Sequence, residues 1–250
     1  MTVGIGCTGL FLACALAFIF IFLPAIELAR ESSKLVPQCK TRLKDLSIGM
    51  HNYAQSHDGA FPDSVWDGSD GLRESWRVRL SPLLDRSELS VSYLPSFAWD
   101  AAENLRVAQS RLEPFTCSAN RLPQDDSGRY FTAYAVITGP ATVFPNQKAI
   151  RVAEITDGTS HTIYIGECSG LNIVWTEPRD IDVSKQKMGI NLPGDRPGFS
   201  SSILSSYHRE GAYVALADGS VRFLSETIDT NVLQALTTAT GGEKVPDEGW

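Results

Sequence analysis

The stretch Ser205–Glu226, SSYHREGAYVALADGSVRFLSE, decides how the C-terminal part of the chain folds. Two runs of alternating residues flank Asp218-Gly219, and Asp-Gly is a strong signal for a tight β-hairpin. We therefore predict a two-residue type I′ turn, in which both central residues have positive φ. His208 stands ten residues before Asp218, which is roughly 30 Å along an extended strand. A direct His–Asp catalytic pair is therefore not expected.

More β-structure is predicted upstream of this hairpin. Three stretches rich in aromatic and β-branched residues are expected to be strands: Tyr130–Gly139, Thr162–Cys168 and Gly170–Glu177. A second Asp-Gly pair, Asp157-Gly158, precedes the strand that contains Glu167. His161 lies between this pair and the strand, among Thr and Ser residues, and we expect it to be a surface or helix-capping histidine. One carboxylate at the end of a strand, Glu167, is weak support for a cation site.

The polar stretch Pro178–Ser206 separates these strands from the hairpin. It is long for a loop in a compact domain and is expected to be an excursion or a mobile flap.

Helical periodicity dominates the first half of the chain. Apolar residues recur at spacings of three and four in Leu43, Leu46, Met50, Tyr53 and Ala54, which predicts an amphipathic helix ending near Gly59. Pro37 is expected to kink or break this helix. Two shorter helical segments are predicted within Ser75–Leu89 and Asp100–Phe115.

The N-terminal segment has the composition of a membrane anchor. Thr2–Ala25 contains no charged residue, and Val3–Leu23 as a helix would be about 32 Å long, which matches a hydrocarbon core of roughly 30 Å. Basic residues follow this segment and none precedes it. Taken alone, the positive-inside rule would place the rest of the chain in the cytoplasm.

Charge and cysteine content restrict the function further. The net charge is −7 and no block of lysine or arginine occurs, so nucleic-acid binding is not expected. Cys39, Cys117 and Cys168 lie outside the apolar segment without C-x-x-C spacing or a neighbouring histidine. A structural zinc site is therefore not expected, and we predict no metal and no cofactor. The sequence leaves two alternatives for these cysteines: a Cys39–Cys117 disulfide, or three buried reduced thiols.

Several motifs, in this order, are similar to one family. They are QCKTRLKDLSIGMHNYAQSHDGAFP with its preceding LPAIELARES, then PFTCSAN, EITDGTSHTIYIGE, WTEP, YHREGAYVALADGSVRFLS and LQALTTATGGE. Together they cover nearly all of the chain, which resembles the planctomycete-type pilin-like family catalogued as domain of unknown function 1559. His208 and Asp218-Gly219 match its His-x9-Asp-Gly signature.

The resemblance implies an α+β, pilin-like protein with a long N-terminal helix, half transmembrane and half amphipathic, followed by a head with an antiparallel sheet. On this basis we expect an anchor over 1–25, a stem helix over 26–58, a head over 59–238 and a tail over 239–250. The resemblance implies no known enzymatic activity and no established cofactor. It also implies a head that faces away from the cytoplasm, and the basic residues after the anchor would then lie on that head.

The family commonly begins with a basic leader, a Gly-Phe pair and a glutamate, and none of these stands before Glu27. We therefore expect a membrane-anchored relative rather than a filament subunit.

Three functions follow from these patterns. The first is a non-enzymatic, pseudopilin-like protein of the inner membrane, embedded in lipid through residues 3–23, with pilin-like or secretion-system subunits as partners and a head in the periplasm or on the cell surface. The second is an extracytoplasmic module that binds a glycan or a cation through loops that include the excursion Pro178–Ser206 and the acidic run Asp63–Asp70. The third is an enzyme using His208, His161, Glu167 and Asp218, for which the sequence offers no visible nucleophile–base pair.

Overall fold

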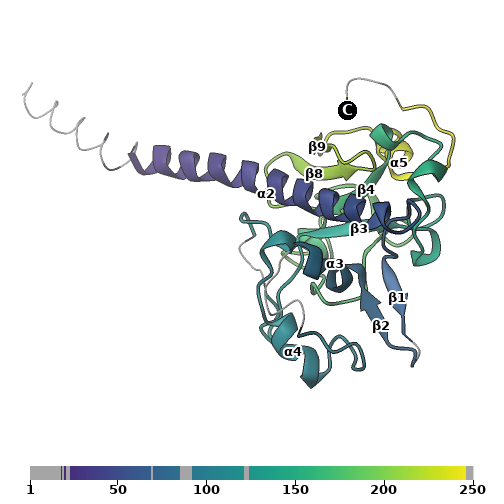
Figure 1. The fold of residues 1–250 in the computed structure, drawn as a ribbon. Coiled ribbons are helices and arrows are strands. Elements are labelled where there is room, and N and C mark those ends of the chain that lie inside the picture. The colour runs from purple at the N-terminus through teal and green to yellow at the C-terminus, as the bar shows by residue number, and fades with distance from the viewer. Residues whose placement is uncertain are drawn as a thin grey trace, which may run out of the picture. The chain divides into compact units, whose positions relative to one another are not determined.

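The computed structural model describes residues 18, 20, 23–68, 70–84, 92–120, 124–245 and 250. The chain divides into two compact units, Met1–Gln38 and Cys39–Trp250, and the second is the head unit (Figure 1). Most of the anchor predicted over residues 1–25 lies outside the described residues. Among the helices of the described part, none combines the length and the apolar character that a membrane crossing requires.

Helix α2 (Leu23–Gln55) contributes its C-terminal half to the head unit. Leu43, Leu46 and Met50 are fully buried there, because residues three and four apart lie on one helix face. The helix continues through Pro37, so the predicted break does not occur, although a proline removes one backbone hydrogen bond. After the helix, Gly59 has a φ of 78° and its N–H donates to the carbonyl of Ala54 at 2.9 Å.

A five-stranded sheet lies in the head unit, with strand order β5-β3-β4-β8-β9. Strands β3, β4, β8 and β9 are labelled in Figure 1. Its strands are β3 (Tyr134–Thr138), β4 (Ile163–Glu167), β5 (Ile181–Asp182), β8 (Gly211–Leu216) and β9 (Val221–Ser225). Strand β5 runs parallel to β3, whereas the other neighbours are antiparallel. The α+β class is therefore confirmed, and the sheet is mixed rather than purely antiparallel.

Both faces of this sheet are covered, which is why every residue of β3 and β4 is buried. On one face, Val136 and Tyr164 pack into the same core as the buried residues of α2. On the other face, Ile137 and Leu216 share a core with α5 (Thr230–Thr237).

Smaller elements surround the sheet. Among the residues that the structure describes, the remaining strands are β1 (Val65–Asp67) and β2 (Arg73–Ser75), which pair antiparallel, and β6 (Lys187–Ile190) and β7 (Ser202–Leu204), which pair parallel. The same part of the chain also contains the α-helices α3 (Trp76–Leu84) and α4 (Ala102–Ala108). Short 3₁₀ turns are η2 (Glu113–Phe115), η3 (Pro145–Gln147), η4 (Val152–Glu154), η5 (Thr159–His161) and η6 (Ser169–Leu171).

Two predictions for residues 170–206 are wrong. Gly170–Glu177 does not form a strand: Asn172 takes a left-handed conformation after η6, and Val174 makes only an isolated bridge to Phe131. The stretch Pro178–Ser206 is not a flap, since it supplies β5, β6 and β7 and buries Ile181 and Leu204. The stretch is polar overall and its strands are only two to four residues long, so its composition did not predict them.

The hairpin predicted around Asp218-Gly219 is confirmed, but its turn type is wrong. Strands β8 and β9 pair with Ala215 opposite Val221. The Gly219 N–H donates to the Leu216 carbonyl at 2.8 Å, and of the two turn residues only Gly219 has a positive φ, of 84°. This is a three-residue loop with a glycine bulge. The Asp218 N–H donates to Thr159 outside the hairpin, so tertiary contacts favour this loop over the tighter turn.

Candidate metal-binding site

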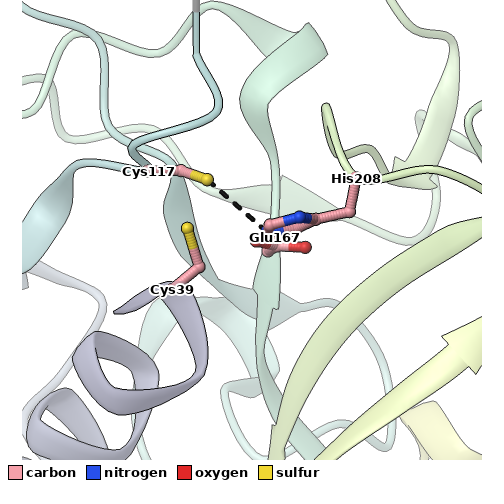
Figure 2. Close-up of side chains that lie close together, drawn as sticks. All are labelled: Cys39, Cys117, Glu167 and His208. Atoms are coloured by element: carbon pink, nitrogen blue, oxygen red, sulfur yellow. Dashed lines mark hydrogen bonds and ion pairs between the residues drawn. The ribbon is translucent and has the colours of Figure 1, made fainter. Parts of the chain in front are cut away.

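Four buried side chains from distant parts of the sequence meet in the head unit: Cys39, Cys117, Glu167 and His208 (Figure 2). One sulfur, nitrogen or oxygen atom from each residue lies within 4.8 Å of the corresponding atoms of the other three. The residues are between 0% and 7% exposed to solvent. We call this group the cysteine cluster.

Two of the four residues are held by neighbouring helical structure. Cys39 lies one turn before Leu43 on the buried face of α2, and its carbonyl accepts a hydrogen bond from the Tyr134 hydroxyl at 3.1 Å. Cys117 follows η2, in a turn closed by the Asn120 N–H, which donates to the Cys117 carbonyl at 3.0 Å.

The other two residues come from the central sheet and a loop beside it. Glu167 is the last residue of β4, and its Oε2 accepts a hydrogen bond from the Tyr213 N–H of β8 at 2.8 Å. His208 lies in the segment between β7 and β8. Its backbone N–H donates to the Ser206 hydroxyl at 3.0 Å, and its ring stands edge-on to Tyr213.

The functional atoms of the cluster face one another. His208 Nε2 lies 3.6 Å from Cys117 Sγ and 3.4 Å from Glu167 Oε1. The second distance is longer than a charge-assisted hydrogen bond of about 2.7–2.9 Å. Within the described part of the chain, Glu167 Oε1 is buried without a hydrogen-bond partner. A buried carboxylate oxygen in this state is costly unless another group binds it.

Three residues of the cluster have strongly shifted pKa values. The Cys117 thiol hydrogen-bonds the Cys39 sulfur, and this lowers the pKa of Cys39 to about 4 while raising the pKa of Cys117. Burial lowers the pKa of His208, but its interactions with Cys39 and Glu167 outweigh burial and raise it to about 10.

The four residues are suited to metal binding, and the two cysteines among them are also suited to forming a disulfide. Two sulfurs, an imidazole and a carboxylate are ligands that transition metals such as zinc prefer. Cys39 and Cys117 are free thiols here, and the disulfide predicted between them stays a prediction that their proximity permits. Sequence spacing gave no sign of this cluster, because its residues come from four separate segments.

The other predicted signature residues lie in turns. His208 and Asp218 fall before and after β8, and the Asp218 carboxylate accepts a hydrogen bond from the Ser220 N–H at 2.8 Å. Asp157 accepts hydrogen bonds from the N–H groups of Gly241 and Gly242, at 2.7 and 2.9 Å. Gly158 has a φ of 95° and precedes η5. Asp157, Gly158, Asp218 and Gly219 therefore stabilise turns of the fold.

The remaining candidates also have local contacts. The His161 Nδ1 lies 3.1 Å from the Ser160 hydroxyl, and His161 is not one of the four residues of the cysteine cluster. In the acidic run 63–70, Asp63 forms a salt bridge with Lys148 at 3.0 Å, and Asp67 one with Arg73 at 3.5 Å.

One comparison with known proteins gives a match. The model of a family described as "Protein of unknown function (DUF1559)" matches residues 29–231. No curated protein and no solved structure matches the chain. All four residues of the cysteine cluster fall within the matched range. Each also lies in a different one of the motifs that carry the sequence resemblance.

Proposed function

Because this chain belongs to the DUF1559 family, we propose that it is a non-enzymatic, pseudopilin-like protein of the inner membrane. In this proposal an apolar N-terminal segment crosses the membrane once, and the head unit is displayed in the periplasm or on the cell surface. Its partners would be pilin-like or secretion-system subunits.

The burial of the cysteine cluster carries the non-enzymatic part of the proposal. The cluster brings thiols, a carboxylate and an imidazole together, but none of these residues is more than 7% exposed. The cavity that includes Cys117 has a volume of about 80 Å³, whereas small-molecule sites are usually about 300–1,000 Å³. A substrate could not reach these groups without a rearrangement of the core, which favours a structural role.

The contacts of the basic residues after the anchor support an exported head. Arg42 Nη1 donates to the Thr116 carbonyl at 2.8 Å, and Lys44 Nζ donates to the Gly219 carbonyl at 2.6 Å. Both side chains are therefore used to hold the helix on the head unit. These contacts explain why basic residues follow the apolar segment, so their presence need not mean that the head unit stays in the cytoplasm under the positive-inside rule.

Accessibility labelling in intact cells tests the orientation. Asp126 is exposed on the head unit, and the described cysteines Cys39, Cys117 and Cys168 are buried, so Asp126→Cys provides a surface thiol over a low background. A membrane-impermeant maleimide should label this variant before lysis and label the parent chain weakly. Labelling that appears only after lysis would contradict an exported head. Deletion of residues 1–25 should move the protein from the membrane fraction to the soluble fraction.

A surface cavity favours a second candidate, a glycan-binding head. This cavity has a volume of about 290 Å³ and is lined by hydroxyl, amide and aromatic groups, among them Asn191, Phe199, Ser200, Ser205 and Tyr207. Aromatic faces beside hydrogen-bonding groups are suited to sugar rings. Thermal-shift measurements against a glycan panel would test it.

A stabilising glycan should lose its effect in Phe199→Ala and keep it in Phe97→Ala, since both side chains are similarly exposed, at 37% and 40%, and only Phe199 lines the cavity. No shift with any glycan would remove this candidate.

A further inference from the structure

We propose that the cysteine cluster is a structural site for one zinc ion or a similar thiophilic divalent metal, with Cys39, Cys117, Glu167 and His208 as its four ligands. The site would join α2, the loop after η2, the end of β4 and the segment before β8.

The chemistry of the donors points to zinc. Structural zinc sites are almost always four-coordinate, and their ligands are thiolates, imidazoles and, less often, carboxylates. Hard cations such as calcium and magnesium bind six or more oxygen ligands. The cluster offers two sulfurs and one nitrogen among four donors, a composition that favours zinc over these ions.

The distances fit a tetrahedral site. With a Zn–S bond of about 2.3 Å and Zn–N and Zn–O bonds of about 2.0–2.1 Å, tetrahedral geometry places sulfur and nitrogen about 3.5 Å apart and nitrogen and oxygen about 3.4 Å apart. The structure has 3.6 Å between Cys117 Sγ and His208 Nε2, and 3.4 Å between His208 Nε2 and Glu167 Oε1. All four donor atoms lie within 4.8 Å of one another.

Glu167 gives a second, independent indication of a ligand. Its Oε1 is fully buried, faces the other donors and has no hydrogen-bond partner in the described part of the chain. A Cys39–Cys117 disulfide would leave this oxygen in the same state, with His208 at 3.4 Å as its nearest cation. A metal ion about 2.0–2.2 Å from the oxygen would satisfy it. A metal would therefore explain why this oxygen has no hydrogen bond, and a disulfide would not.

The surroundings hold the donors in place, as outer contacts do in metal sites. The Tyr213 N–H fixes Glu167 by binding Oε2 and leaving Oε1 for the cluster. The Tyr134 hydroxyl binds the Cys39 carbonyl, which fixes that turn of α2 against β3. Because all four positions are filled by protein and closed to solvent, the site would be structural rather than catalytic.

The metal content of the full-length chain, purified in detergent under reducing conditions, tests the proposal. Elemental analysis after incubation with Zn²⁺ and desalting should give one zinc per chain. Replacement by Co²⁺ should give the absorption bands of a tetrahedral, thiolate-ligated ion. Cys117→Ser should lose the zinc and the thiolate-to-cobalt band.

Cys168→Ser is the matched control, because Cys168 is also a buried free thiol but lies outside the cluster. It should keep the full metal content. Glu167→Gln keeps the side-chain volume and the contact with the Tyr213 N–H, so this variant is expected to fold. It should weaken zinc binding about ten-fold or more in a chelator competition.

Three results would overturn the proposal. The first is a folded, reduced wild-type chain that retains no zinc. The second is a zinc content that Cys117→Ser and Cys168→Ser lower equally. The third is a non-reducing mass map in which Cys39 and Cys117 of the membrane-extracted protein are fully disulfide-bonded.

Discussion

Arg77 and Asp180 form a salt bridge in the interior of the head unit, with 2.6 Å between Nη1 and Oδ1 and both side chains at most 2% exposed. The same guanidinium donates to the carbonyls of Trp175, Glu177 and Arg179. The same carboxylate oxygen accepts a hydrogen bond from Trp76 Nε1 at 2.9 Å. This network fastens α3 to the segment that leads into β5.

Removing the charge of Asp180 should be strongly destabilising, because Arg77 would remain buried without its counter-ion. We expect Asp180→Asn to lower the free energy of unfolding by about 3–5 kcal/mol, measured by urea denaturation of the full chain in detergent. Asp182→Asn is the control, since its partner Lys185 is exposed at the surface, and it should cost less than about 1 kcal/mol. Equal effects of the two substitutions would argue against the network.

The hydroxyl pair Ser47–Tyr164 joins α2 to β4. The two oxygens lie 2.6 Å apart and both residues are fully buried. Tyr164→Phe should cost about 1–3 kcal/mol, because the Ser47 hydroxyl is left buried without a partner. In the double variant Ser47→Ala/Tyr164→Phe that penalty disappears, so the two single effects should not add. Strict additivity in the double-mutant cycle would show that the contact contributes no coupling.

Two glycines of the β8–β9 hairpin should respond differently to a methyl group. A Cβ at Gly211 would lie 2.0 Å from the backbone carbonyl oxygen of Leu224 on the paired strand. A Cβ at Gly219 meets nothing nearer than 3.5 Å, but its φ is 84°.

Gly219→Ala should therefore cost about 1–2 kcal/mol through backbone strain alone. Gly211→Ala should cost more, because the strands must separate. Thermal unfolding of the two variants checks the order, and a smaller loss for Gly211→Ala would contradict the pairing.

Asp229 caps the N-terminus of α5. Its carboxylate accepts hydrogen bonds from the N–H groups of Asn231 at 2.7 Å and Val232 at 3.4 Å. Asp229→Ala should lower the free energy of unfolding by about 1 kcal/mol, and Asp229→Asn by much less, because asparagine also caps helices well. Chemical denaturation would measure both, and an Asp229→Ala variant as stable as the parent would rule out the cap.

Local patterns sufficed where the local sequence determines the structure. The alternation around Asp218-Gly219 predicted the hairpin, and the aromatic and β-branched run at 162–168 predicted β4. The turn type was wrong because the N–H groups of Ala217 and Asp218 bind Thr162 and Thr159. No pattern inside a four-residue window contains that information.

The cysteine cluster could not be predicted for a related reason. Metal sites are recognised in sequence when two ligands share one turn, as in C-x-x-C. Here Cys39, Cys117, Glu167 and His208 come from a helix, two loops and a strand, and only the packing of α2 against the sheet brings them together. The strands in 178–206 were missed because they are only two to four residues long and lie in a polar stretch.

The bond from Lys44 Nζ to the Gly219 carbonyl spans 175 positions of the chain. During synthesis, Lys44 cannot make this contact until Gly219 has left the ribosome. Contacts between residues so distant in sequence slow folding, and apolar surface stays exposed to solvent until they form.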